Sequence, residues 1–169
     1  FVNFVKLTGA STNQDICSGT VIEANDVPHE IRHAQMLYTA MKYSDKCFMG
    51  STMGAQGAKD SIRMASILFG SEAQLAEKPR FISILCSLTP LKYDVRMLGA
   101  LMEYARAGQP QLISSLSIAG ATGPVTLAGN LALQNASLVC ETLNLGAFYA
   151  GYVVAASNFN ARLTSLLKL

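Results

Sequence analysis

Short apolar runs alternate along most of the chain with longer segments that place an apolar side chain every three or four residues. The runs predict buried strands, and the longer segments predict amphipathic helices that turn one face toward a sheet. The predicted strands are residues 15–22, 46–50, 80–87 and 111–117. The predicted helices are residues 28–43, 56–69, 94–107 and 124–143, with one further turn over 73–77.

Local signals refine several of these elements. Pro28 begins the first helix, and Asp26 is placed to cap it. The run 80–87 is apolar almost throughout, which predicts a strand that is buried on both faces. Residues 147–157 fit either a strand or part of a helix, and residues 160–169 fit a helix.

Strand and helix alternate four times, and repeated βα units build a parallel sheet. Such a sheet is either open or closed into a barrel. No internal repeat, low-complexity tract or linker divides residues 1–169. The sequence therefore predicts a single α/β domain.

A glycine turn meets the start of a predicted helix at residues 120–136. Gly120 and Gly123 allow backbone angles and close approaches that a side chain would forbid. Pro124 suits the first turn of a helix, and Thr122 is placed to cap it. Free N–H groups at a helix start attract electron-rich groups, so the turn is a candidate ligand contact. A phosphate is one such ligand, although the pattern lacks the Lys-Ser/Thr of a P-loop.

Three consecutive predicted strands end in small polar residues. In a parallel barrel the carboxyl ends of the strands meet at one rim, where active sites lie. Although serine and threonine are common in any turn, the repeated ending favours a polar pocket at that rim. The residues that follow the strands are Ser51 with Gly50 and Thr52, Ser87 with Thr89, and Ser117 after Ser114 and Ser115.

Composition excludes several classes of function. Half of the residues are hydrophobic, 14% are charged, and the net charge is +2 without a lysine or arginine cluster, which argues against a nucleic-acid surface. No segment approaches the roughly 20 apolar residues of a membrane span. The first residues lack a signal-peptide pattern, so we expect a cytoplasmic protein. The chain does not begin with methionine, which suggests processing or a piece of a longer protein.

Cysteines and histidines indicate no metal site. Cys17, Cys47, Cys86 and Cys140 form no Cys-x-x-Cys pair, so we expect reduced thiols. His29 and His33 have the i, i+4 spacing that could present two imidazoles to one metal. The metalloprotease pattern is absent, and we interpret the two histidines as part of a polar helix face.

The segment Gly120-Ala-Thr-Gly-Pro-Val-Thr-Leu-Ala-Gly129, with Gln134-Asn135-Ala136, resembles the signature of the trimethylamine:corrinoid methyltransferase family, including its members for quaternary amines such as glycine betaine. The resemblance covers residues 1 to 136, and residues 137–169 diverge. Other segments that resemble the family in order and spacing are Phe4-Val-Lys-Leu7, Asp26-Val-Pro-His-Glu-Ile-Arg-His33, Glu77-Lys-Pro79, Thr89-Pro-Leu91 and Leu101-Met-Glu-Tyr-Ala-Arg-Ala-Gly108.

This resemblance implies a TIM (β/α)8 barrel, of which the chain supplies roughly half. It implies methyl transfer from a tertiary or quaternary methylated amine to the cobalt of a corrinoid, which a partner protein carries. Half a barrel exposes strand edges, which favours a homo-oligomer. The alternatives are a fragment of such an enzyme and a non-catalytic scaffold or binding protein derived from its fold.

The resemblance also implies candidate residues, although none is assigned a catalytic role. Gly120, Thr122 and Gly123 would meet the substrate or the corrinoid through backbone N–H groups, together with the hydroxyls of Ser51, Ser87, Thr89 and Ser117. Aromatic faces attract a cationic amine, and the candidates by type are Tyr43, Phe48, Tyr149 and Tyr152. The family usually has glutamate after Asn-Ala, whereas this chain has Ser137, which removes a carboxylate that could orient the amine.

Overall fold

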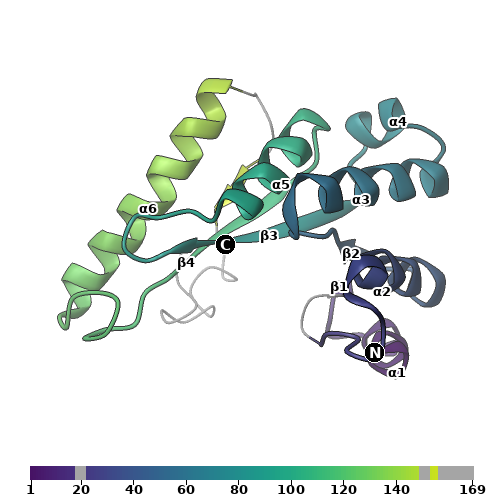
Figure 1. The fold of residues 1–169 in the computed structure, drawn as a ribbon, viewed down its shortest axis with the longest axis horizontal. Coiled ribbons are helices and arrows are strands. Elements are labelled where there is room, and N and C mark those ends of the chain that lie inside the picture. Colours follow the sequence, from purple (N-terminus) through teal and green to yellow (C-terminus); the bar gives the residue numbers. More distant parts are fainter. Residues whose placement is uncertain (18–21, 149–152, 156–169) are drawn as a thin grey trace.

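The computed structural model describes residues 1–17, 22–148 and 153–155. It is an α/β structure in which strands and helices alternate (Figure 1). In chain order the elements are α1 (Val2–Ala10), β1 (Ile16–Cys17), α2 (His29–Tyr43), β2 (Cys47–Met49), α3 (Gly54–Phe69), α4 (Glu72–Glu77), β3 (Phe81–Leu88), α5 (Val95–Arg106), β4 (Gln111–Leu116), α6 (Leu127–Phe148) and β5 (Val153–Ala155).

The five strands form one sheet in the order β1-β2-β3-β4-β5, and every neighbouring pair is parallel. Helices that follow one another also touch, α1 with α2, α2 with α3, and α3 with the short α4, and α3 also contacts α5. Each strand therefore lies beside the next one in the chain, as the predicted βα units require. The α/β class and the parallel sheet are confirmed.

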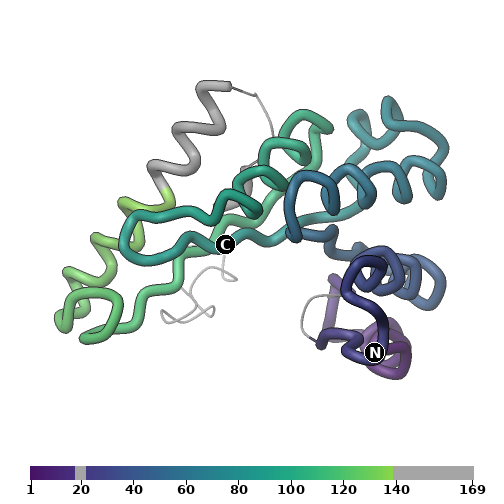
Figure 2. The backbone as a smooth tube through the Cα atoms, in the orientation of Figure 1, coloured from purple at the N-terminus to yellow at the C-terminus, as the bar shows by residue number. Residues whose placement is uncertain are grey.

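The two halves of the sheet are strongly staggered. Strand β3 pairs with β2 only at its beginning, where Phe48 faces Phe81 and Met49 faces Ile82. It pairs with β4 over the rest of its length, up to the partners Leu88 and Leu116. Strand β2 therefore ends six residues before β3 does, about 20 Å along the strand. Figure 2 shows the consequence, with the N-terminal elements at one end of the molecule and the β4–α6 loop at the other.

Two hydrophobic clusters hold the helices against the sheet. In the first, Phe48 and Phe81 stack with ring centroids 5.5 Å apart, and Tyr104 meets Phe81 edge-on at 5.6 Å. Ring pairs of this kind add to the stabilisation from buried apolar area. The second cluster joins β3 and β4 to α5 and α6 through Leu85, Leu101, Ala105, Ile113 and Leu138.

Strand β3 is buried on one face, not on both. Phe81, Ser83, Leu85 and Ser87 are buried, whereas the residues between them are partly exposed. Phe81 and Leu85 pack against α5, so the buried face is the one that the helices cover. The expectation of two buried faces was wrong because an apolar run does not show how many faces have a neighbour.

Several predicted limits also need correction. Helix α1 was not predicted at all. Asp26 does not cap α2, since Pro28 holds the N-cap position and no side chain caps the helix. Helix α3 begins at Gly54, two residues early. The segment 147–157 holds the end of α6 and strand β5, and residues 160–169 lie outside the described residues.

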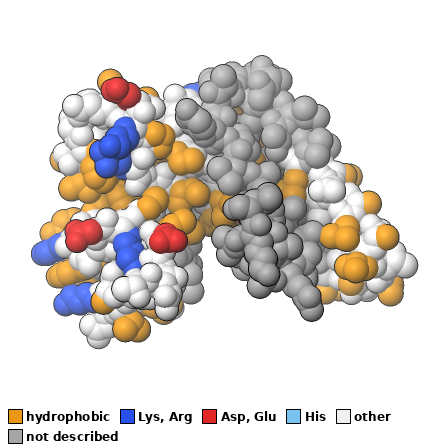
Figure 3. Space-filling model, turned by 180° about the vertical axis from the view of Figure 1, so that it is seen from behind, with side chains coloured by type: hydrophobic (Ala, Val, Ile, Leu, Met, Phe, Trp, Pro, Cys, Tyr) orange, Lys and Arg blue, Asp and Glu red, His pale blue; other side chains and the backbone are white. Residues whose placement is uncertain are grey.

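The predicted reduced state holds for Cys17, Cys47 and Cys86, which are free thiols. Burial raises the pKa of the Cys47 thiol. In the ranges that the structure describes, no helix is long and apolar enough to cross a membrane. Exposed apolar side chains gather at the β4–α6 end, where Figure 3 shows a group of them. They are Leu116, Ile118, Val125 and Leu127.

Candidate functional site

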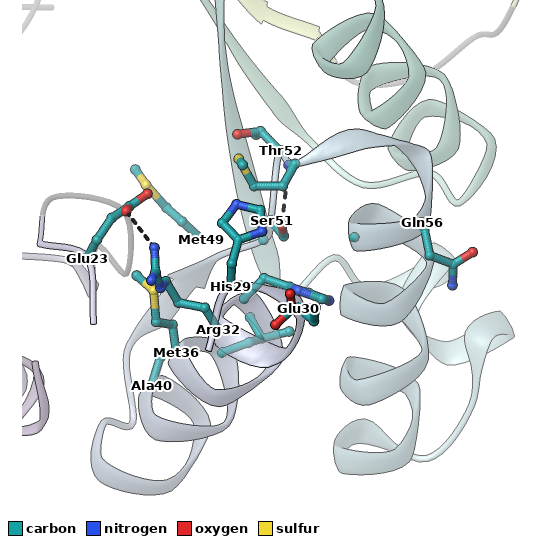
Figure 4. Close-up of a pocket in the computed structure, with 15 residues that line it drawn as sticks. Glu23, His29, Glu30, Arg32, Met36, Ala40, Met49, Ser51, Thr52 and Gln56 are labelled. Carbon is teal, nitrogen blue, oxygen red and sulfur yellow. Dashed lines mark hydrogen bonds and ion pairs between the residues drawn. The ribbon is translucent and has the colours of Figure 1, made fainter. Parts of the chain in front are cut away.

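A cavity of about 400 Å³ lies at the carboxyl end of β2, between α2 and the beginning of α3 (Figure 4). The carboxyl ends of parallel strands are where α/β folds place ligands. One part of the lining is apolar and includes three methionines. The lining residues are Glu23, His29, Glu30, Arg32, His33, Met36, Leu37, Ala40, Met49, Gly50, Ser51, Thr52, Met53, Gln56 and Gly57.

Arg32 fastens the loop before α2 to the helix. Its Nε and Nη2 donate hydrogen bonds to the carbonyl oxygen of Val27 at 3.1 and 3.0 Å. Its Nη1 donates to Glu23 Oε2 at 3.2 Å, a pair that Figure 4 shows at one side of the cavity. A planar guanidinium can hold both groups at once because its donors diverge in fixed directions. The Arg32 charge is thereby paired within the cavity wall.

Tyr104 supports the Ser51 turn from below. Its hydroxyl donates a hydrogen bond to the carbonyl oxygen of Ser51 at 2.6 Å, and the Ser51 N–H donates to Ser61 Oγ at 3.0 Å. Burial raises the pKa of Tyr104 far above its ordinary value, so this hydroxyl stays protonated as a donor. Hydrogen bonds at Ser51 therefore join the turn after β2 to both α3 and α5, beside the cavity.

A carboxylate connects the two helices that flank the cavity. Asp60 Oδ2 lies 3.1 Å from His33 Nε2, and Asp60 Oδ1 accepts a hydrogen bond from Gln56 Nε2 at 3.0 Å. His33 belongs to α2, whereas Gln56 and Asp60 belong to α3. Among the described residues, no group of three or more metal-ligating side chains exists.

The carboxyl end of β4 is built differently. The Ile118 carbonyl oxygen accepts hydrogen bonds from the N–H groups of Ala121, Thr122 and Gly123, and the Gly120 N–H donates to the Gly123 carbonyl oxygen. Thr122 Oγ1 accepts from the Ile118 N–H at 3.0 Å. The N–H groups of residues 120–123 are therefore all bonded within the loop.

A side-chain contact closes the same loop. Ser117 Oγ donates to Asn130 Oδ1, and both residues are buried. A Cβ on Gly123 would collide with both of these side-chain oxygens, so only glycine fits there. Gly120 needs glycine for a different reason, its φ of +78°.

The model of the trimethylamine methyltransferase family (MTTB) matches residues 1–153. The chain belongs to this family. It is 55% identical over 139 residues to the glycine betaine methyltransferase of Desulfitobacterium hafniense strain Y51. The aligned segment covers 82% of this chain and 29% of that protein. It is 32% identical over 113 residues to the trimethylamine methyltransferase MttB of Desulfitobacterium hafniense strain DSM 10664 / DCB-2. That aligned segment covers 67% of this chain and 21% of the relative.

A more distant relative is the proline betaine:corrinoid methyltransferase of Eubacterium limosum, 26% identical over 145 residues, 82% of this chain and 30% of the relative. The chain thus spans less than a third of the length of these relatives. The resemblance stated from the sequence is confirmed, and the match reaches beyond residue 136 to residue 153.

In this member of the trimethylamine methyltransferase family, the predicted strand-end residues do not meet at one place. Ser51 lines the cavity. Because of the stagger, Ser87, near the end of β3, lies about 10 Å further along the sheet than Ser51, and Thr89 and Ser117, which follow β3 and β4, lie about 17 Å further. Thr89 Oγ1 donates to the Leu116 carbonyl oxygen, and Ser87 lies on the buried face of β3.

The glycine turn needs two corrections. Helix α6 begins at Leu127, not at Pro124, and Thr126 caps it in place of Thr122, since Thr126 Oγ1 accepts from the Gly129 N–H at 3.3 Å. The N–H groups of Gly120, Thr122 and Gly123 already have partners in the loop. Their role in binding substrate or corrinoid stays a prediction.

The aromatic candidates do not form a box around the cavity. Phe48 is buried in the aromatic stack. Tyr43 ends α2, and the Lys6 ammonium already lies 4.8 Å above its ring. Tyr149 and Tyr152 lie outside the described residues. Neither Tyr43 nor Phe48 lines the cavity.

Ser137 is fully buried on α6, and its Oγ donates to the Leu133 carbonyl oxygen at 3.0 Å. This serine is not among the residues that line the cavity, and its effect on the orientation of an amine stays a prediction. The functional candidates that sequence reasoning missed are Glu30, Arg32, Met36, Met49 and Gln56. His29 and His33 were interpreted only as a polar face.

Proposed function

We propose that the protein takes part in moving a methyl group from a quaternary amine to the cobalt of a corrinoid carried by a partner protein. The observation that carries the proposal is the 55% identity to a glycine betaine methyltransferase over 82% of this chain. That similarity is much higher than the 32% identity to a trimethylamine methyltransferase. Glycine betaine is therefore the first substrate to test.

The cavity suits a small methylated ammonium. Met36, Met49 and Met53 offer polarisable, adaptable surfaces to methyl groups, and Glu30 offers a carboxylate that makes no ion pair among the described residues. His29 and Arg32 supply hydrogen-bond donors for the carboxylate of a betaine. Methyl transfer asks the protein mainly to hold the substrate in line and to exclude water.

A barrel is the proposed complete architecture. Parallel strands that follow chain order, with neighbouring helices in contact, are typical of half a (β/α) barrel. In the described residues β1 and β5 are the edges of the sheet. We infer that further strands close the barrel, from the rest of a longer protein or from a second copy of this chain.

The test supplies the protein with the reduced corrinoid protein and glycine betaine, trimethylamine or proline betaine, and follows the cobalt absorbance. We expect conversion to methyl-cobalt with glycine betaine fastest. The variant Glu30→Gln should slow it, and Asp45→Asn, an exposed carboxylate outside the cavity lining, should not. Folded protein that gives no conversion with any amine would contradict methyl transfer by this chain and favour the alternatives, a fragment of such an enzyme or a non-catalytic scaffold of the same fold.

A further inference from the structure

Asp60 stands behind the cavity wall and holds two residues that line it. Its two carboxylate oxygens are divided between His33 Nε2, at 3.1 Å, and Gln56 Nε2, at 3.0 Å. Asp60 is not itself a lining residue. The carboxylate therefore acts on the cavity through two side chains from different helices.

This arrangement determines which nitrogen of His33 a ligand can meet. An ionised carboxylate only accepts hydrogen bonds, so His33 Nε2 carries the proton that points to Asp60. In the neutral imidazole the other nitrogen, Nδ1, is then an acceptor. The His33 side chain is 22% exposed and lines the cavity, so Nδ1 is the ring atom left for a ligand.

An acceptor separates two kinds of ammonium. A quaternary amine has no N–H group, whereas the tertiary amine left after one methyl is lost takes up a proton at neutral pH and gains one. We propose that His33, positioned by Asp60, accepts a hydrogen bond from this N–H, so that the cavity holds a demethylated amine more tightly than its quaternary parent. The identity of the amine rests on the proposed function.

The other charged groups of the cavity differ from His33 in a testable way. Glu23 is paired with Arg32. Glu30 is exposed in the first turn of α2 and attracts either ammonium by its charge. Removing the Glu30 charge should therefore weaken both ligands by a similar factor, whereas removing His33 should weaken only the ligand with an N–H.

The experiment compares glycine betaine with N,N-dimethylglycine, which differ by one methyl group, by titration calorimetry on the full chain. We expect the wild type to bind dimethylglycine about tenfold more tightly, as a hydrogen bond to a charged group allows. His33→Phe should remove this preference, Asp60→Ala should weaken it by freeing the ring tautomer, and Asp60→Asn, which keeps an acceptor, should restore part of it. Glu30→Gln should keep the preference, and Asp45→Asn should change neither affinity.

The proposal is overturned if the wild type shows no preference, if the preference survives in folded His33→Phe, or if Glu30→Gln abolishes it. If His33→Phe does not fold, ¹⁵N spectra of His33 decide the point. They should show the Nε2–H tautomer in the wild type, a mixture in Asp60→Ala, and a shift of Nδ1 on adding dimethylglycine only. An Nδ1 signal that dimethylglycine leaves unchanged also overturns the proposal.

The two proposals fail separately. Methyl transfer without any preference between the two ligands would leave the proposed function intact and remove the role of His33. A preference that depends on His33 in a protein that transfers no methyl group would support the role of His33 and contradict the proposed function.

Discussion

The turns that follow β2 and β4 both contain a small polar residue, but only the turn after β2 lines the cavity. Ser51 and Ser117 each follow a parallel strand, and each precedes a helix. At β2 the turn opens on the cavity, which is also lined by polar side chains of α2, among them His29 and Glu30. At β4 the backbone and side-chain donors are bonded within the loop. A small polar residue after a strand therefore indicates a turn, and its surroundings decide whether a ligand fits.

The largest effect is expected from a substitution that breaks the closed loop. In Gly123→Ala the new Cβ collides with Ser117 Oγ and Asn130 Oδ1, which should cost about 3 kcal/mol of unfolding free energy. Gly120→Ala is the matched control, because its Cβ meets only Val125 Cγ2 at 3.7 Å. It should cost about 1 kcal/mol through its positive φ. Urea unfolding measures both, and equal costs would contradict the packing argument.

A second, smaller loss of stability is expected when the hydrogen bond that supports the turn after β2 is removed. Tyr104→Phe removes the buried hydrogen bond to Ser51 and should cost about 1.5 kcal/mol. The substitution should also change the response to alkali. Burial raises the pKa of Tyr104, so above about pH 10, the ordinary value, the unfolded chain loses the proton first and stability falls as pH rises.

Thermal unfolding at pH 8 and pH 11 separates the two contributions. The wild type should lose more stability than Tyr104→Phe over this interval, because the variant has no hydroxyl to ionise at that position. An identical loss in the two proteins would show that Tyr104 does not produce the alkaline response.

The two serines give a direct contrast between the strand ends. Ser117→Ala leaves Asn130 Oδ1 without its donor and should cost about 1 kcal/mol, with ligand affinity unchanged. Ser51→Ala loses only the weak bond that Ser51 Oγ accepts from the Met53 N–H at 3.3 Å. It should cost less stability and change betaine affinity instead. Calorimetric titration of both variants checks this, and the reverse pattern would invalidate the contrast.

The smallest effect belongs to Glu23. Its side chain is 58% exposed where it pairs with Arg32, so Glu23→Gln should change stability by less than about 0.5 kcal/mol. Arg32→Lys should cost more, since a lysine cannot hold Val27 and Glu23 together. Equal effects in denaturant titrations would mean that the Val27 contact contributes nothing.

Sequence patterns predicted those features that neighbouring residues determine. The burial of Ala58, Ile62 and Ala65 on one face of α3 follows from their spacing, and the alternation of strands with helices follows from the same periodicity. Helix α1 was missed because the buried residues Val5 and Thr8 form no clear apolar stripe.

The stagger of β2 against β3 is a property of pairing between distant segments, and no local pattern records it. The cavity escaped prediction for the same reason. His33 meets Asp60 across 27 residues of sequence, so from α2 alone it is a partly exposed polar residue on a helix face. The family was predicted from contiguous motifs, which need no tertiary information.

Because β2 and β3 pair over only two residues, we expect the N-terminal third of the chain to unfold locally before the rest of the sheet. Backbone pairing there is limited to Phe48 with Phe81 and Met49 with Ile82, whereas β3 and β4 are paired along their length. Hydrogen exchange should therefore release the amides of β1 and β2 well before those of β3 and β4. The cavity is lined by the end of β2 and by residues of α2 and α3, so a bound amine would hold β2 to these helices and slow that exchange, which makes local opening a measure of occupancy.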